Sequence, residues 1–153
     1  MKKVLFVCLG NICRSPAAEG VFIAELKKRG IESDFIVDSA GTSGFHDGEW
    51  PDERMIAQAK KRNVVLPSRS RKITSEDLIN FDYILCMDQS NLSNVLKLDL
   101  ANKYQDKIKL FTDFRYKMEY KFVPDPYFGT ISDFDLVLDI VADAAMGFLE
   151  SLK

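Results

Sequence analysis

A cysteine and an arginine stand six positions apart at Cys8 and Arg14, with residues suited to a tight loop between them. Gly10 and Asn11 tolerate the left-handed backbone conformations with which a loop can turn successive N–H groups inward around an anion. Those N–H groups, a following helix N-terminus and the Arg14 guanidinium would all favour the thiolate form of Cys8. The spacing therefore predicts a nucleophilic sulfur beside a site for an oxyanion.

The residue types in this loop indicate that the oxyanion is a phosphoryl group. Arg14 carries a planar fork that binds two phosphate oxygens at once. Ser15 can donate a hydrogen bond to the sulfur, which stabilises it as the attacking group and later as the leaving group. Cys13 has two interpretations, a small packed residue or a redox partner of Cys8. We expect seven consecutive residues to bind the phosphate: Leu9, Gly10, Asn11, Ile12, Cys13, Arg14 and Ser15.

A candidate proton donor lies between two prolines, at Asp125. The ester oxygen leaves a phosphoryl group as an anion unless a carboxylic acid supplies a proton to it. Taken alone, an Asp-Pro pair indicates a turn, but together with the Cys8 loop it favours catalysis. We expect Asp125 to act as an acid in the first step and as a base toward water in the second. No metal ion or cofactor is required by this scheme, because N–H groups and Arg14 can neutralise the transferred group.

Three aromatic residues are candidates for the walls of a substrate cleft. Tyr127 and Phe128 follow the proposed acid, and Phe45 lies in a turn-rich stretch after the second apolar run. Such side chains could sandwich a phenyl ring and leave alkyl phosphates poorly held. His46, the only histidine, is interpreted as a partly exposed loop residue without a catalytic role.

Alternating strand and helix patterns predict the framework that positions these residues. Short apolar runs predict strands over 4–8, 35–37, 83–87 and 108–111. Helices are predicted from a Ser15 cap to Gly30, after Asp52, at a Thr74–Asp77 capping box, over 91–98 and from Ser132 to the C-terminus. The polar and aromatic stretch over 112–129 is predicted to be a long loop.

This alternation is typical of the α/β class, with a four-stranded, parallel, open sheet and helices on both faces. Ligands bind beyond the carboxyl ends of the strands in such sheets, which is where the Cys8 loop follows the first strand. The length of 153 residues fits a single domain over 1–153.

Composition and charge exclude several classes of protein. The formal net charge is −2, without the basic surplus typical of proteins that bind nucleic acid or anionic membranes. Three cysteines are too few for a secreted disulfide framework, and no pattern of metal-ligand spacing is present. No export signal or membrane anchor is visible, so we expect a cytoplasmic protein with no membrane partner.

Four stretches of the sequence together resemble the low-molecular-weight protein tyrosine phosphatases: VCLGNICRSP, DSAGTSGFHDG, YILCMD and PDPY. The resemblance spans the chain and implies the Rossmann-like phosphotyrosine phosphatase I fold, with no metal or cofactor. It also implies tyrosine-phosphorylated proteins as substrates and hydrolysis through a phosphocysteine intermediate.

Carried over by position, the resemblance makes Cys8 the nucleophile, Arg14 the phosphoryl-binding residue and Asp125 the general acid. It implies that Asn11 and Ser15 hold the loop and the thiolate. It further implies that Ser39 supports Asn11.

One departure from the family pattern lies at Ser68-Arg69-Ser70-Arg71, where many relatives carry a histidine ahead of an Ala-Arg pair. A bracing contact from that imidazole is therefore missing or supplied by Ser68.

We expect the protein to be a monomer or a weak homo-oligomer that buries the aromatic rim of the cleft.

Two other functions are compatible with parts of this pattern. An arsenate reductase shares the loop but needs a relay of further cysteines, and only Cys86, in an apolar run, is present beyond the loop. A non-catalytic phosphotyrosine-binding module would keep Arg14 and lose Cys8 or Asp125, whereas this chain has both.

Overall fold

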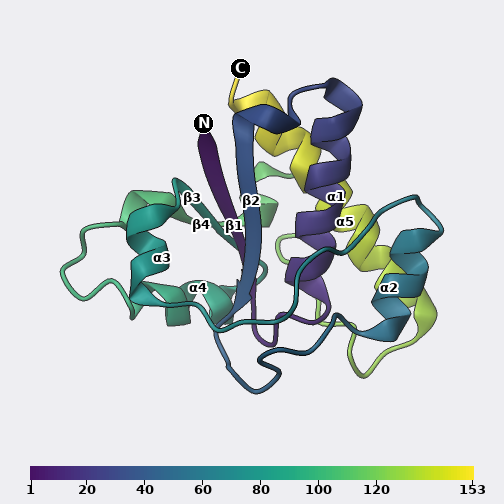
Figure 1. The fold of residues 1–153 in the computed structure, drawn as a ribbon, viewed down its shortest axis with the longest axis horizontal. Coiled ribbons are helices and arrows are strands. Elements are labelled where there is room, and N and C mark those ends of the chain that lie inside the picture. Colours follow the sequence, from purple (N-terminus) through teal and green to yellow (C-terminus); the bar gives the residue numbers. More distant parts are fainter.

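The computed structural model describes residues 1–153 and has four parallel strands at its centre (Figure 1). The strands stand in the order β2-β1-β3-β4, which confirms the predicted open parallel sheet. Their bounds are β1 Lys2–Cys8, β2 Phe35–Gly41, β3 Tyr83–Cys86 and β4 Ile108–Leu110. β2 is longer than the predicted run over 35–37, because Asp38 to Gly41 continue its pairing with β1.

Five α-helices and three short 3₁₀ helices connect and cover the strands. The α-helices are α1 Arg14–Arg29, α2 Glu53–Lys60, α3 Ser75–Asn80, α4 Gln89–Leu96 and α5 Ile131–Ser151. The 3₁₀ helices span Glu32–Asp34, Gln105–Lys107 and Phe111–Phe114. The last of these covers the end of the strand predicted over 108–111 and the start of the long loop predicted over 112–129. None of the helices has the length and apolar composition required to cross a bilayer.

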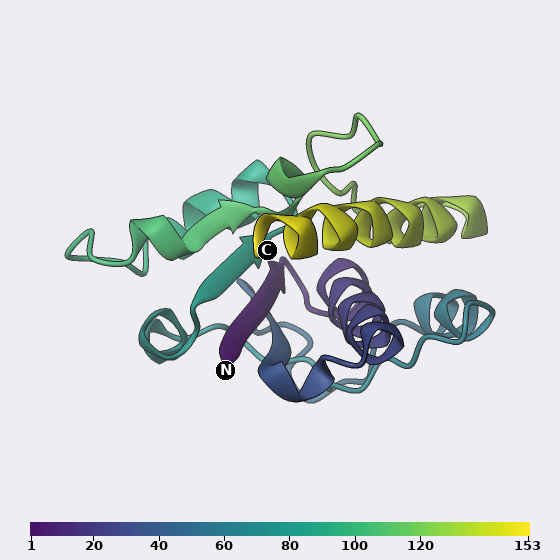
Figure 2. The ribbon, with the colours of Figure 1, turned by 90° about the horizontal axis from the view of Figure 1, so that it is seen from above.

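The alternation of side chains along the central strand builds a core on each face of the sheet. Val4, Phe6 and Cys8 point into the larger core, which α1, α2 and α5 cover. Leu5 and Val7 point to the other face, where α3 and α4 complete a smaller core. Figures 1 and 2 show α1 and α5 side by side on one side of the sheet and α3 and α4 on the other, which confirms the prediction of helices on both faces.

The helix boundaries follow the predicted caps except at α1 and α4. The helix predicted over 91–98 lies two residues earlier, at Gln89–Leu96. Gly30 ends α1 in the left-handed conformation, with φ 71°, and the Thr74–Asp77 capping box begins α3. Asp52 caps α2 through the N–H of Arg54. The prediction that Ser15 caps α1 was wrong: the helix already begins at Arg14, and the Ser15 hydroxyl contacts the Cys8 sulfur instead.

Candidate active site

The loop between β1 and α1 has its carbonyl groups held by the surrounding protein. Main-chain N–H groups of Thr42, Ser43, Asp52 and Ala17 donate to the carbonyls of residues 8, 9, 12 and 13, at 2.8 to 3.2 Å. The carbonyl of residue 10 accepts from the Ser70 hydroxyl at 2.9 Å. Because C=O and N–H point in opposite directions across a trans peptide, this arrangement turns the N–H groups of the loop toward its centre, away from the groups that hold its carbonyls.

Six N–H groups of this loop and the first turn of α1 donate to no protein acceptor. They belong to Leu9, Gly10, Ile12, Cys13, Arg14 and Ser15. Asn11 has a left-handed backbone, with φ 55°, as the wrapping of the loop requires. Unpaired N–H groups at a helix N-terminus form a ready site for an anion.

The Cys8 sulfur lies at the base of this loop and makes hydrogen-bond contacts with groups on two sides. The N–H of Asn11 donates to Cys8 Sγ at 3.3 Å, and Ser15 Oγ lies 3.0 Å from the same sulfur. The cysteine is almost fully buried, so these contacts replace those that water would make to a thiolate.

Arg14 is buried beside the loop and is oriented by the end of β3. Its Nη1 donates to Asp88 Oδ2 at 2.6 Å and to the carbonyl of Val123 at 3.1 Å. Burial opposes the charge of Arg14, but Cys8 and Asp88 outweigh this effect and raise its pKa above the ordinary value. Asp88, which sequence reasoning missed, also caps α4 through the N–H of Asn91.

A cavity of about 210 Å³ opens over the loop and brings most of the predicted site residues together. Its lining consists of Cys8, Leu9, Gly10, Ile12, Cys13, Arg14, His46, Asp125, Tyr127 and Phe128. Asn11, Ser15 and Ser39 lie behind this lining and support it.

Asp125 reaches the cavity from the segment that follows β4. Val123, two residues earlier, is buried and donates its N–H to Met87 at the end of β3, at 2.8 Å. Asp125 Oδ2 lies 3.8 Å from Arg14 Nη2, and its side chain is 48% exposed. The carboxyl group is therefore a solvent-exposed part of the same cavity lining that contains the buried Cys8.

The aromatic candidates are divided by the structure. The Tyr127 and Phe128 rings pack edge to face with centroids 4.9 Å apart, and both line the cavity. Phe45 lies outside the lining and is 85% exposed, packed edge-on against His46. The neighbouring His46 lines the cavity instead, and its Nδ1 forms a hydrogen bond with Glu49. This histidine was not among the residues predicted to form the site.

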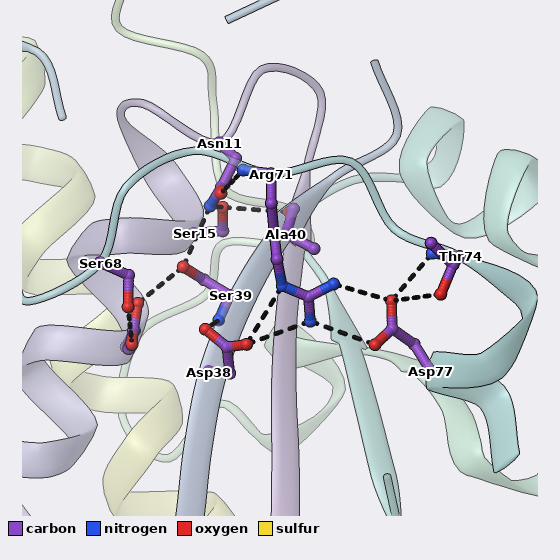
Figure 3. Close-up of polar contacts among 10 residues, drawn as sticks. Asn11, Ser15, Asp38, Ser39, Ala40, Ser68, Arg71, Thr74 and Asp77 are labelled. Carbon is purple, nitrogen blue, oxygen red and sulfur yellow. Dashed lines mark hydrogen bonds and ion pairs between the residues drawn. The ribbon is translucent and has the colours of Figure 1, made fainter. Parts of the chain in front are cut away.

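A chain of hydrogen bonds with a fixed direction supports the loop (Figure 3). The N–H of Arg71 donates to Asn11 Oδ1 at 3.0 Å, which directs Asn11 Nδ2 toward Ser15 Oγ at 2.8 Å and Ser39 Oγ at 3.0 Å. Ser39 in turn donates to Glu19 Oε1 at 2.6 Å. The hydroxyl hydrogen of Ser15 is thereby left for its two remaining neighbours, the Cys8 sulfur at 3.0 Å and the more distant Ala40 carbonyl at 3.4 Å.

Glu19 ends this chain and was not predicted from the sequence. It is buried within α1 and also accepts a hydrogen bond from Ser68 Oγ at 2.6 Å. Ser68, the residue at the departure from the family pattern, therefore braces the loop through Glu19. The only sequence signal for Glu19 is its position among the buried residues of a helix. Periodicity alone cannot distinguish a buried glutamate at such a position from an exposed one.

The pH dependence of stability provides a test of the buried Glu19. Burial raises its pKa above the usual value of 4.5, although hydrogen bonds from Ser39 and Ser68 act in the opposite direction. The folded protein therefore holds this proton more tightly than the unfolded chain, and the free energy of unfolding should fall as pH rises above about 4.5. In Glu19→Gln this component is absent, so urea denaturation between pH 4 and pH 7 should give a flatter profile than in the unmodified protein. Glu119→Gln, at an exposed position, is the matched control and should leave the profile unchanged; an equal change there would contradict the assignment.

The two other cysteines differ from Cys8 in their surroundings. Burial, followed by the Asp52 carboxylate, raises the pKa of Cys13 far above its ordinary value, and burial does the same for Cys86. Cys86 belongs to the core on the opposite face of the sheet from Cys8. A cysteine relay of the kind required by the arsenate reductase alternative therefore has no accessible member beyond the loop.

No group of three or more His, Cys, Asp or Glu side chains lies close enough to hold a metal ion.

Comparison with known proteins agrees with this geometry. The family model described as "Low molecular weight phosphotyrosine protein phosphatase" matches residues 3–153. The human protein of that name is 41% identical over 150 residues, covering 97% of this chain and 94% of its own length. A crystal structure of a protein tyrosine phosphatase from Entamoeba histolytica has a TM-score of 0.94 and 40% identity, and covers 99% of this chain and 97% of its own. A Drosophila arginine phosphatase is 32% identical with a TM-score of 0.92, covering 100% and 98%. The chain thus belongs to the low molecular weight phosphotyrosine protein phosphatase family.

Proposed function

We propose that this protein hydrolyses phosphotyrosine in protein substrates through a phosphocysteine intermediate on Cys8. The observation that carries the proposal is the placement of a buried sulfur, six unpaired N–H groups and Arg14 around one cavity, with a solvent-exposed carboxyl group in its lining. Membership of the family supports the same activity.

In the first step, the Cys8 thiolate attacks phosphorus and the S–P bond forms as the P–O bond to the tyrosine ring breaks. Asp125 donates its proton to the departing phenol oxygen. The charge that spreads over the three equatorial oxygens is stabilised by the loop N–H groups and by the free edge of Arg14.

In the second step, Asp125 is a carboxylate and accepts a proton from a water molecule that attacks phosphorus. The S–P bond breaks, inorganic phosphate leaves and the thiolate is restored. Ser15 and the Asn11 N–H, at 3.0 and 3.3 Å from the sulfur, stabilise its negative charge before the first step and during the second. A sulfur used in this way has to stay reduced, which fits the cytoplasm as the proposed compartment.

Hydrolysis of p-nitrophenyl phosphate and of a phosphotyrosine peptide in EDTA, with vanadate as inhibitor, tests this function. We expect turnover of both substrates and competitive inhibition by vanadate. A phosphoarginine peptide is a necessary comparison, because one relative of the same fold is an arginine phosphatase. A preference for phosphoarginine would contradict the proposed substrate and favour an arginine phosphatase. Arsenate-dependent thiol oxidation without phosphatase activity would favour an arsenate reductase.

The aromatic wall is expected to determine which phosphate esters are held. Tyr127 lines the cavity beside Phe128, and the Arg54 guanidinium stacks over its ring at 5.5 Å. In Tyr127→Ala we expect the KM for a phosphotyrosine peptide to rise about tenfold, because a ring-stacking contact is lost. The inhibition constant of inorganic phosphate, which has no ring, should stay within about twofold of that of the unmodified protein. An equal weakening of both would instead indicate that the loop itself had moved.

A further inference from the structure

Ser70 is the one residue whose side chain holds a carbonyl group of the Cys8 loop. Its Oγ donates to the carbonyl of Gly10 at 2.9 Å, sixty positions away in the sequence. The other held carbonyls of the loop accept from main-chain N–H groups, which no substitution other than proline removes. The orientation of the Gly10 carbonyl therefore depends on a side chain that is a departure from the family pattern noted above.

The Gly10 carbonyl and the Asn11 N–H belong to the same peptide plane. Since the peptide is trans, a carbonyl held outward by Ser70 directs the N–H inward, where it donates to Cys8 Sγ at 3.3 Å. The two flanking residues would permit another orientation, because glycine accepts most backbone angles and Asn11 already has a left-handed backbone. This peptide can therefore adopt more than one orientation, and in this chain the Ser70 hydroxyl holds it in one of them.

The segment that carries Ser70 is itself anchored on several sides. Ser70 is 4% exposed, and its main chain bonds to Glu49 and Gly48, each at 2.8 Å. The next residue, Arg71, donates its N–H to Asn11 Oδ1 and pairs its guanidinium with Asp38 and Asp77 (Figure 3). The brace therefore has a fixed position relative to the sheet.

We propose that Ser70 is a positioning residue that keeps the Gly10–Asn11 peptide turned so that its N–H faces the nucleophile and the phosphoryl site. It acts through that peptide and contacts neither the sulfur nor the substrate. The inference rests on the proposed function of Cys8, but it concerns an orientation of the backbone that can be measured without turnover.

The test compares Ser70→Ala with Ser93→Ala, which removes an exposed hydroxyl on α4. The readouts are the ¹H–¹⁵N signal of the Asn11 amide, the Kd of inorganic phosphate, and kcat and KM for p-nitrophenyl phosphate. In Ser70→Ala we expect the Asn11 signal to shift and phosphate affinity and kcat/KM each to fall about five- to tenfold. Ser93→Ala should match the unmodified protein in all three. Ser70→Thr, which keeps the hydroxyl, should restore the Asn11 signal and most of the phosphate affinity.

An unchanged Asn11 signal and phosphate Kd in Ser70→Ala would overturn the positioning role, as would a loss of the same size in Ser93→Ala. A threonine variant as defective as the alanine variant would also count against this role. The Asn11 signal and the phosphate Kd can be measured on the folded protein even if either variant is less stable. Should the unmodified protein lack phosphatase activity while the signal and phosphate Kd respond as expected, the proposed function fails and the role of Ser70 stands. Should the protein be active and Ser70→Ala be indistinguishable from it, the role of Ser70 alone fails.

Discussion

Replacement of Cys8 by serine is expected to abolish turnover and to leave oxyanion binding intact. A serine hydroxyl is far less ionised and less nucleophilic than a thiolate in the same place, so kcat should fall by about four orders of magnitude or more. The N–H groups of the loop and Arg14 remain in place in Cys8→Ser, because none of the carbonyl contacts that hold the loop involves the sulfur.

Steady-state assays with p-nitrophenyl phosphate and calorimetric titration with inorganic phosphate check the two halves of this prediction. Cys13→Ser is the matched control, because the contribution expected of Cys13 to phosphate binding is its main-chain N–H, which serine keeps. It should retain most of its activity. Near-normal hydrolysis by Cys8→Ser would exclude Cys8 as the nucleophile, and loss of phosphate binding would show that the sulfur is needed for the shape of the loop.

Asp125→Asn is expected to reduce kcat in proportion to the basicity of the leaving group. The amide cannot supply a proton, so an aryl phosphate with a basic leaving phenol should lose about 10²- to 10³-fold. An activated ester, whose phenolate leaves without help, should lose far less. Binding of phosphate should not weaken, because the substitution removes a negative charge 3.8 Å from Arg14.

A series of substituted phenyl phosphates measures this dependence directly. Asp113→Asn, at an exposed position of the 3₁₀ helix after β4, is the control and should follow the unmodified protein across the series. Equal losses for basic and activated leaving groups in Asp125→Asn would argue against proton donation and for a role of the carboxyl group in holding the loop.

Local patterns in the sequence located the residues that surround the reacting group. Cys8, Gly10, Asn11 and Arg14 are close together in the chain, and their arrangement follows from one strand, one tight loop and one helix start. Asp125 is distant in the chain. Its match to the general acid of the family identified it, the need of the leaving oxygen for a proton supported the assignment, and the structure brings it to the same cavity. The order of the strands also follows from physical rules, since parallel strands joined by helices leave few topologies.

The residues that orient this group were not predictable, because each acts through a partner far away in the sequence. Asp88 contacts Arg14 across 74 positions and Ser70 contacts the loop across 60, while Glu19 accepts from Ser39 and Ser68 across 20 and 49. Nothing in their own neighbourhoods distinguishes these residues from surface residues. The sequence also did not show that His46, and not the neighbouring Phe45, lines the cavity. Adjacent residues in an irregular turn point in different directions, and no periodicity determines which one faces inward.

Apart from Arg14, the donors proposed to surround the phosphoryl group belong to the main chain, and every residue except proline supplies one. Side chains at Leu9 and Ile12 can therefore diverge among descendants of this protein without removing a phosphate contact. Leu9 is 49% exposed at the rim, where a new side chain would meet the part of a substrate that lies outside the pocket. Substrate preference can in this way evolve on the same loop that keeps the affinity for phosphate constant.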